Sequence, residues 1–256
     1  MKSWQDHLIN YDELVINSEI QLRHDFDQLF ISSLASQLYC EKKLEFDIKY
    51  KPEPTAEQKL GSEIHEELIP VEPIEAGKLV NDIKSGKEVV SIFPVFYQYQ
   101  KISIVGIHDG VVFENSKPRY LFEIKSTGGK LNKVWPGEKF QAFLYGFALE
   151  KMGFDTSELE IVIPKVKQNI VKEGIIDPIL HHLKDKSIHK FHLENPNIRL
   201  HIFEFSQKNK ADVIIQLNEL VKFWKKEREA NGSGNMVKCG PCSYRNECDY
   251  YQIKKP

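Results

Sequence analysis

Two carboxylates and a lysine near the middle of the chain have the spacing of a hydrolytic metal site. Asp109 precedes Gly110 at the end of one β-branched run, and Glu123 and Lys125 lie two positions apart in the next. Because side chains alternate along a strand, Glu123 and Lys125 share one face, and a hairpin would bring Asp109 beside Glu123. Two carboxylates suit Mg²⁺ or Mn²⁺, and a nearby lysine can orient or deprotonate an attacking water and stabilise phosphate charge.

A plainer interpretation of these residues is also open. Asp109 and Gly110 would then be an ordinary turn, and Glu123 and Lys125 a solvated pair on an edge strand. The neighbouring runs VVF and YLF indicate strands that are buried on at least one face. Charge in such surroundings is costly unless a metal or another group compensates it, which favours a functional site.

Four cysteines form a second group with chemical potential. Cys239, Cys242 and Cys248 lie in the segment CGPCSYRNEC, and Cys40 is far upstream. A disulfide framework is not expected in a reducing compartment. Three nearby thiolates can bind one metal centre, and Cys40 is the only cysteine left to complete a set of four. An iron–sulfur cluster, zinc and free thiols are the alternatives at this point.

The elements that must position these residues alternate between helices and strands. Apolar periodicity in segment 31–46 predicts a short helix with Cys40 at its end. In segment 56–69 it predicts a second helix, with His65 near the buried edge. β-Branched and aromatic runs between 88 and 127, with turn formers at 115–118, predict a strand meander. Further along we expect a helix at 136–153 closed by Gly153, strands at 158–166 and 199–206, helices at 177–190 and 208–230, and a hinge at 231–234.

Length and composition fit one ordinary folded domain. The chain has 256 residues, of which 41% are hydrophobic, and a formal net charge of −2. This excludes wholesale disorder and nucleic-acid binding by bulk positive charge. We expect one α/β domain over residues 1–256, with a central mixed β-sheet flanked by helices and a small C-terminal cysteine cluster module. With no apolar run of membrane-spanning length and no signal-peptide core, a cytoplasmic protein is expected.

The order of the acidic residues resembles the catalytic core of the PD-(D/E)XK nuclease superfamily, and two flanking elements resemble its RecB-like branch. The matching positions are Asp109, Glu123 and Lys125 for the core, Gly61 to His65 for the G-x-x-x-H element, and Gln141 to Tyr145 for the Q-x-x-x-Y element. Alone, His65 would be an ordinary packing residue, and Gln141 and Tyr145 a helix-stabilising pair. Their occurrence in the family order supports the resemblance.

This resemblance implies a restriction-endonuclease-like core and a metal-dependent DNA nuclease, acting as an exonuclease, a single-strand endonuclease or both. The residues it implies are His65, Asp109, Glu123 and the carbonyl of Ile124 for Mg²⁺ or Mn²⁺, and Lys125, Asp109, Glu123, Gln141 and Tyr145 for catalysis. Lys125 would assist the attack of water on the phosphate, and Gln141 and Tyr145 would position Lys125 and the scissile strand. The competing hypothesis is a nuclease-fold DNA-binding or scaffold subunit in which cutting is dispensable.

The segment from Ser33 to Phe46 resembles the N-terminal ligand segment of RecB-like nucleases that carry an iron–sulfur cluster, most of all the CRISPR-associated spacer-adaptation exonucleases. In these families one cysteine precedes the nuclease core and three follow it. The resemblance implies a structural 4Fe–4S cluster, with segments 31–46 and 235–251 forming its module and Cys40, Cys239, Cys242 and Cys248 as ligands. Glu41 departs from the pattern, since a basic pair commonly follows the first cysteine in the CRISPR-associated group.

The implied partners are single-stranded DNA or duplex DNA with overhangs, together with CRISPR integrase proteins, and no membrane. The implied setting is the processing of DNA before spacer acquisition, with recombination or repair as the next alternative.

Two basic segments lie outside these motifs. Segment 165–195 is rich in lysine and histidine, and is either an insertion that faces DNA or a partner, or a solvated charged helix. In the second segment, basic residues at 222–228 flank Phe223 and Trp224. These aromatics either stack on bases beside a phosphate backbone or belong to the core.

Overall fold

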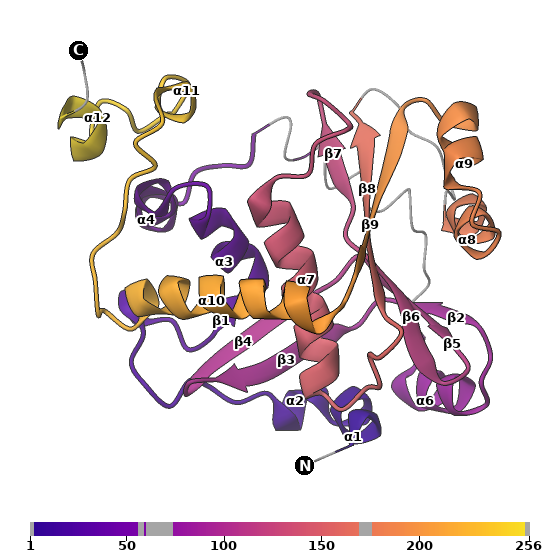
Figure 1. Cartoon of the computed structure of the whole chain (residues 1–256). Helices are drawn as coiled ribbons and strands as arrows, with labels where there is room; N and C mark the ends of the chain where they lie inside the picture. The colour runs from indigo at the N-terminus through magenta and orange to yellow at the C-terminus, as the bar shows by residue number, and fades with distance from the viewer. Residues whose placement is uncertain (1–2, 56–58, 60–73, 169–175, 254–256) are drawn as a thin grey trace.

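The computed structural model describes residues 3–55, 59, 74–168 and 176–253, and shows an α/β protein with mixed β-sheets flanked by helices (Figure 1). The strands are β1 (Leu29–Phe30), β2 (Val89–Ser91), β3 (Pro94–Tyr99), β4 (Ile102–Ile107), β5 (Gly110–Glu114), β6 (Lys117–Phe122), β7 (Lys125–Thr127), β8 (Glu160–Lys167) and β9 (Ile198–Glu204). The helices are α1 (Trp4–Ile9), α2 (Tyr11–Leu14), α3 (Ile31–Gln37), α4 (Glu41–Tyr50), α6 (Ala76–Lys84), α7 (Pro136–Lys151), α8 (Ile176–Lys184), α9 (Ile188–Glu194), α10 (Gln207–Trp224), α11 (Met236–Cys239) and α12 (Asp249–Ile253). Within these described ranges, no helix has the length and apolar character needed to cross a membrane.

The larger sheet is built around β8. β5 and β6 form an antiparallel hairpin, β9 pairs antiparallel with β8, and both β6 and β7 run parallel to β8. The register is the same for the last two pairings, since Phe122 lies opposite Val162 and Lys125 opposite Lys165. β6 and β7 therefore behave as one strand whose pairing is interrupted between residues 122 and 125.

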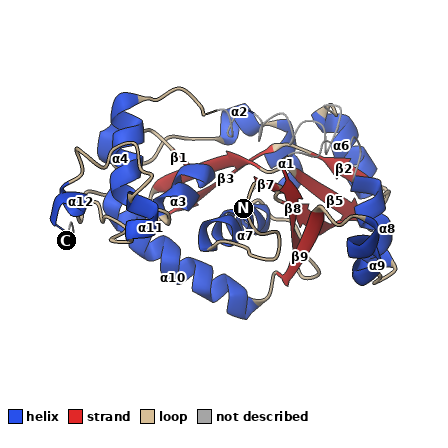
Figure 2. Cartoon of the chain, turned by 90° about the horizontal axis from the view of Figure 1, so that it is seen from above, coloured by secondary structure: helices blue, strands red, loops and turns tan. Residues whose placement is uncertain are grey.

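Alternation of side chains gives this sheet two differently covered faces. Leu121 and Ile163 belong to the main core together with residues of α7, whereas Phe122 and Ile124 pack in a second core with residues of α8 and α9. Figure 2 shows α7 and α10 on one side of the strands and α8 and α9 on the other. Glu123 and Lys125, in phase with Leu121, therefore face α7.

A second, three-stranded sheet supports α7 from another side. Its strand order is β1-β4-β3, with β1 parallel and β3 antiparallel to β4. Helices α3 and α7 pack against each other and against this sheet. Gly106 in β4 makes the close approach possible, since a Cβ there would lie 2.8 Å from Cε1 of Tyr145 in α7.

Several elements predicted from the sequence are confirmed. The meander between 88 and 127 is present, and its hairpin turn at Asn115 and Ser116 has both residues at positive φ. The helix expected at 136–153 is α7, and Gly153, at φ 96°, follows its end. β8 and β9 match the two predicted strands. The helix predicted over 56–69, with His65, lies outside the described residues apart from the helical Lys59.

Other elements differ from the prediction, each for a local reason. Segment 31–46, where a short helix with Cys40 at its end is expected, contains parts of two helices, because Cys40 has an extended backbone (φ −172°, ψ 118°) and caps the start of α4. The helix expected at 177–190 is split into α8 and α9 where Lys186 adopts a positive φ of 52°. α10 ends at Trp224 instead of continuing to 230, and Lys226 just beyond it has φ 62°.

The two basic segments contribute to the core. Phe223 and Trp224 are fully buried, so they are core residues and do not form a stacking surface. Segment 165–195 supplies Ile179 and Phe191 to the second core, and Lys165 is only 1% exposed. The exposed side chains of this segment include His181, which lies 3.3 Å from the carboxylate of Asp185 just beyond the end of α8.

A buried polar network joins α4 to the chain that leaves α10. The carboxylate of Glu41 accepts two hydrogen bonds of 2.5 Å from the Arg228 guanidinium, one of 2.7 Å from the main-chain N–H of Asn231 and one of 2.7 Å from Gln37. Gln37 in turn accepts a hydrogen bond of 2.9 Å from the indole N–H of Trp224. Glu41, the residue directly after Cys40, therefore connects the start of α4 to the segment that leads to the other cysteines.

The network sets the ionisation of Glu41. Burial alone would raise the pKa of this carboxyl, but the hydrogen bonds from Arg228, Asn231 and Gln37 lower the pKa below its ordinary value. Charge-assisted hydrogen bonds of this kind are about twice as strong as neutral ones. The folded state therefore holds Glu41 as a carboxylate.

Replacing Glu41 with glutamine is expected to lower the free energy of unfolding at neutral pH by about 1.5–3 kcal/mol, because the charge-assisted hydrogen bonds are lost. The folded-state pKa lies below the ordinary value. The stabilisation is therefore complete above the ordinary value and disappears as the pH falls through the folded-state pKa. Urea unfolding at about pH 7 and about pH 4 should show a smaller difference between wild type and Glu41→Gln at the acidic pH. Glu13→Gln, at an exposed position, is the control, and an equal difference at both pH values would contradict the assignment.

Candidate functional site

Asp109 occupies the interruption between β6 and β7. It lies in the short connection from β4 to β5, and its Oδ2 atom accepts a hydrogen bond of 2.6 Å from the main-chain N–H of Ile124. The N–H of Glu123 donates to the carbonyl of Val162 at 3.1 Å, so the chain still follows β8 here. The predicted hairpin between Asp109 and Glu123 is confirmed, and it brings the two residues to the same end of the sheet.

Glu123, Lys125 and Gln141 form a connected polar group on the face below α7. Glu123 is only 2% exposed, and Nζ of Lys125 lies 2.7 Å from its Oε1 and 3.0 Å from Oε1 of Gln141. Burial would lower the pKa of Lys125, but the charge of Glu123, with smaller contributions from Asp109 and Glu138, raises it above its ordinary value. Lys125 is accordingly a cation held between a carboxylate and an amide.

Tyr145 closes the inner side of this group. It is 3% exposed, and its ring makes an edge-to-face contact with His108 at 6.2 Å between centroids. Burial raises the pKa of its hydroxyl, and the charge of Glu123 adds to the effect. Tyr145 is therefore a neutral hydrogen-bonding group that lies one helical turn from Gln141 and beside the carboxylates.

Sequence reasoning missed two residues of the site, of which Lys165 is the first. It is 1% exposed, lies opposite Lys125 in the register of β7 and β8, and forms an ion pair of 2.5 Å with Glu138 at the start of α7. The other carboxylate oxygen of Glu138 accepts the main-chain N–H of Trp135 at 2.8 Å. The sequence placed Lys165 in a charged stretch, and only its phase with Ile161 and Ile163 indicated a buried face.

His108, next to Asp109, is the second residue that was missed. It is 1% exposed, and its ring packs edge-to-face on Phe93 at 4.7 Å. Burial lowers the pKa of His108 to about 4, against the opposing charge of Asp109. Within the described part of the chain, neither ring nitrogen has a hydrogen-bond partner. The signal for it was a polar residue at the end of the buried run ISIVGI.

A cleft of ≈ 530 Å³, here called the α7 cleft, opens from this polar group along the start of α7. Lys125, Gln141, Tyr39, Lys238 and Trp135 are among the residues that line it. The cleft gives a ligand access to Lys125, whose side chain is 21% exposed.

Two of the three predicted metal-binding side chains lie in the described part of the chain. Asp109 and Glu123 are in place, and Ile124 between the two strands is fixed by its N–H. His65, the third predicted side-chain ligand, lies outside the described residues. Among the residues that are described, no three His, Cys, Asp or Glu side chains form a metal-binding group. The structure thus supplies two of the three predicted ligand side chains, with oxygen donors that suit Mg²⁺ or Mn²⁺.

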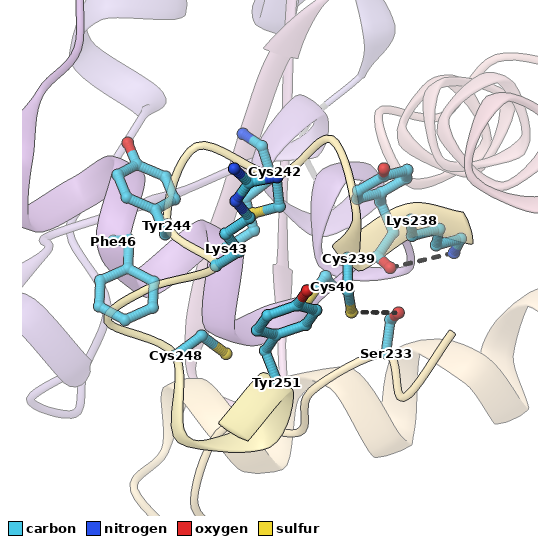
Figure 3. A pocket seen from close by; sticks show the side chains of 12 residues that line it. Cys40, Lys43, Phe46, Ser233, Lys238, Cys239, Cys242, Tyr244, Cys248 and Tyr251 are labelled. Atoms are coloured by element: carbon cyan, nitrogen blue, oxygen red, sulfur yellow. Dashed lines mark hydrogen bonds between the residues drawn. The ribbon is translucent and has the colours of Figure 1, made fainter. Parts of the chain in front are cut away.

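The four cysteines line one pocket but do not converge on one point. Figure 3 shows Cys40, Cys239, Cys242 and Cys248 around this pocket, and all four are free thiols. The C-terminal cysteine cluster expected from the sequence is therefore not seen among the described residues: the four cysteines are scattered around the pocket. Cys40 is held at the start of α4, while the other three lie at separate turns of the C-terminal segment.

The surroundings of this pocket suit thiolates. Lys43, Lys238 and Arg245 line it, and among its described lining residues there is no carboxylate or imidazole. Tyr244 anchors the segment to α4, since its ring stacks on Phe46 at 5.0 Å and its hydroxyl donates to Asp47 at 2.9 Å. The donor set is purely sulfur with positive charge nearby, which matches an anionic metal–thiolate centre.

No family model matches the chain, and no curated protein matches it. Among solved structures, the crystal structure of SSO0001 aligns with 97% of this chain and 95% of its own, at 11% sequence identity and a TM-score of 0.46. A similarity at this level does not assign a family or an activity.

The energetic coupling between Glu138 and Lys165 can be measured directly. Glu138→Gln should lower the free energy of unfolding by about 3–5 kcal/mol, because it leaves the buried ammonium of Lys165 without its counter-charge. Adding Lys165→Met should recover most of the loss, since no unpaired charge remains. Urea denaturation of the two single variants and the double variant measures this coupling. Lys130→Met, at an exposed position, is the control, and a double variant no more stable than Glu138→Gln would refute the coupling.

Proposed function

We propose that this protein is a Mg²⁺- or Mn²⁺-dependent DNA nuclease of the RecB-like branch of the PD-(D/E)XK superfamily. One observation carries the proposal. Asp109 and Glu123 meet at an interruption in a buried strand, and Lys125 links Glu123 to Gln141 on the covering helix. Carboxylates at a strand break, with a lysine on the same face, are the elements that hydrolysis of a phosphodiester needs.

The arrangement of the sheet supports the finer assignment of a restriction-endonuclease-like core. The hairpin of β5 and β6 supplies Asp109 and Glu123, and the parallel strand β8 lies next in the sheet. α7 then crosses this face and contributes Gln141 and Tyr145. These residues follow each other in the chain in the order expected for the RecB-like branch.

Each residue has a role that its position makes physically reasonable. A divalent ion bound by His65, Asp109, Glu123 and the Ile124 carbonyl would activate water and neutralise phosphate charge. Asp109 orients the Ile124 peptide through its N–H. Lys125 remains protonated beside Glu123, so it can donate hydrogen bonds to a phosphate oxygen. Gln141 holds the Lys125 ammonium, and the neutral hydroxyl of Tyr145 lies behind the carboxylates.

The cysteines extend the proposal to a structural 4Fe–4S cluster. Cys40, Cys239, Cys242 and Cys248 would hold it, and the three basic residues at the pocket would balance its negative charge. A cluster places iron and sulfide atoms between its ligands, so its thiolates stand farther apart than around a single zinc ion. It would close a long loop and stiffen the junction already made by Glu41 and Arg228.

The proposed substrate is single-stranded DNA or duplex DNA with overhangs. The proposed setting is the processing of DNA before spacer acquisition in a CRISPR system, with integrase proteins as partners, and recombination or repair as the next possibility. A scaffold subunit would need neither the Lys125–Gln141 contact nor an open cleft at Lys125, so the geometry favours cutting.

Cleavage of labelled single-stranded DNA should require Mn²⁺ or Mg²⁺ and stop on chelation. Asp109→Asn and Lys125→Ala should each reduce the rate by at least about a hundredfold, because each removes a group that stabilises transition-state charge. Lys190→Ala, whose side chain is 70% exposed, is the matched control and should cut normally. Cleavage that survives both substitutions would refute the assignment. DNA binding without cleavage by the wild type would support the scaffold hypothesis instead.

Protein purified without oxygen should be brown and contain about four iron atoms per chain, as a cluster of this type does. Cys40→Ser and Cys239→Ser should each lower the iron content and the melting temperature, because the loop is no longer closed. Visible absorption, metal analysis and thermal unfolding measure these effects. A colourless protein with one tightly bound zinc would overturn the cluster assignment.

A further inference from the structure

The wall of the α7 cleft carries an exposed aromatic ring on a main chain that is held by a helix cap. Trp135 is 51% exposed, yet it caps α7, and its main-chain N–H is bonded to Glu138 at 2.8 Å. Nζ of Lys133 lies 3.8 Å from the centre of the indole ring. An exposed indole is costly in water, so one that lies beside a cation in a cleft indicates a ligand with both a flat apolar part and an anion.

The same combination occurs at a second place in the cleft. Tyr39 is 45% exposed, and Nζ of Lys238 lies 4.5 Å from the centre of its ring. The Lys238 ammonium is also fixed by donating to the carbonyl of Tyr39 at 3.0 Å. Two aromatic rings, each with its own lysine, therefore line one continuous cleft that also contains Lys125.

The separation of the two rings is set by close helix packing. Trp135 comes directly before α7, and Tyr39 follows α3 after one residue. The two helices touch where Gly137 meets α3, since a Cβ at Gly137 would lie 2.9 Å from the carbonyl oxygen of Ala35. The backbone positions that carry the two rings are accordingly preorganised, which reduces the entropy cost of binding.

The charge of the cleft selects an anion. Among the described residues that line it, Glu138 is the single carboxylate, and it is already paired with Lys165. The remaining charged lining residues are Lys125 and Lys238, and Lys133 lies beside the cleft wall. A cleft with aromatic platforms and lysines matches a nucleic-acid strand, because every base has a flat face and every linkage a charge.

We propose that Trp135 and Tyr39 are base-stacking platforms for a single DNA strand, whose phosphates contact Lys133 and Lys238 as the strand runs to Lys125. The inference rests on the nuclease function proposed above and deepens it. Unpaired bases are required, since the flat faces of bases inside a duplex are covered by their neighbours. The platforms thus make the cleft selective for single strands by contact with bases and not by charge alone.

The test measures binding in the presence of chelator, so that no cutting is needed. Fluorescence anisotropy is recorded with a labelled oligothymidylate, with a strand of equal length that has abasic sites, with a blunt duplex and with the matching RNA. Trp135→Ala and Tyr39→Ala should each weaken oligothymidylate binding by about tenfold or more, and should leave binding of the abasic strand and the duplex nearly unchanged. Trp135→Phe should retain most of the affinity. Phe30→Ala removes an aromatic that is 52% exposed but does not line the cleft, and is the control.

The outcomes separate this inference from the nuclease assignment. Wild-type affinity of Trp135→Ala and Tyr39→Ala for oligothymidylate would overturn the platforms, even if Asp109→Asn abolishes cutting. Equal losses on the normal and abasic strands would also overturn them, because contact with bases would not be involved. Ring-dependent binding in a protein that never cuts would uphold the platforms and refute the nuclease. RNA binding that is tighter than DNA binding and depends on both rings would overturn the choice of DNA as the ligand.

Discussion

The hydrogen bond from the Ile124 N–H to Asp109 is the interaction on which the rest of the site depends. β5 begins opposite Phe122, so the main chain beyond that point has no strand partner on this side. The Asp109 carboxylate takes the place of the missing strand and accepts the N–H that would otherwise be left unpaired. This hydrogen bond fixes the Asp109 carboxylate near Glu123 and keeps Lys125 in register with β8. One bond thus satisfies a backbone group and assembles the charged centre.

α7 contributes three site residues from one face of the helix. Glu138, Gln141 and Tyr145 are spaced by three and four residues, so they lie on one face of the helix, and this face covers the sheet. Glu138 neutralises Lys165, Gln141 contacts Lys125, and Tyr145 lies beside Glu123. Without Glu138, the buried ammonium of Lys165 would lie beside Lys125 without a counter-charge. Because Lys165 is paired with Glu138 and Lys125 with Glu123, two lysines can occupy neighbouring strand positions at this site.

Sequence patterns predicted what depends on local periodicity. Alternation placed Glu123 and Lys125 on one face, apolar runs predicted the strands, and helical spacing put Gln141 and Tyr145 one turn apart. Contacts between distant segments were not predictable in the same way. Lys165 looked like part of a charged stretch because its partner is on another element. The sequence left Phe223 and Trp224 open between the core and a stacking surface. Breaks at Cys40 and Lys186 depend on single backbone angles, which apolar periodicity does not encode.

The near-neutral net charge takes its meaning from where the charges lie. Lys125 and Lys165 are each paired with a glutamate, whereas Lys133 and Lys238 lie against the exposed rings at the α7 cleft. Tyr39 and Lys238 line both this cleft and the cysteine pocket, and each directly precedes a cysteine in the chain. Any group that fixes Cys40 relative to Cys239 therefore also fixes a ring and its lysine in the cleft. In this fold, the stability of the cysteine region and the shape of the ligand path are set by the same residues.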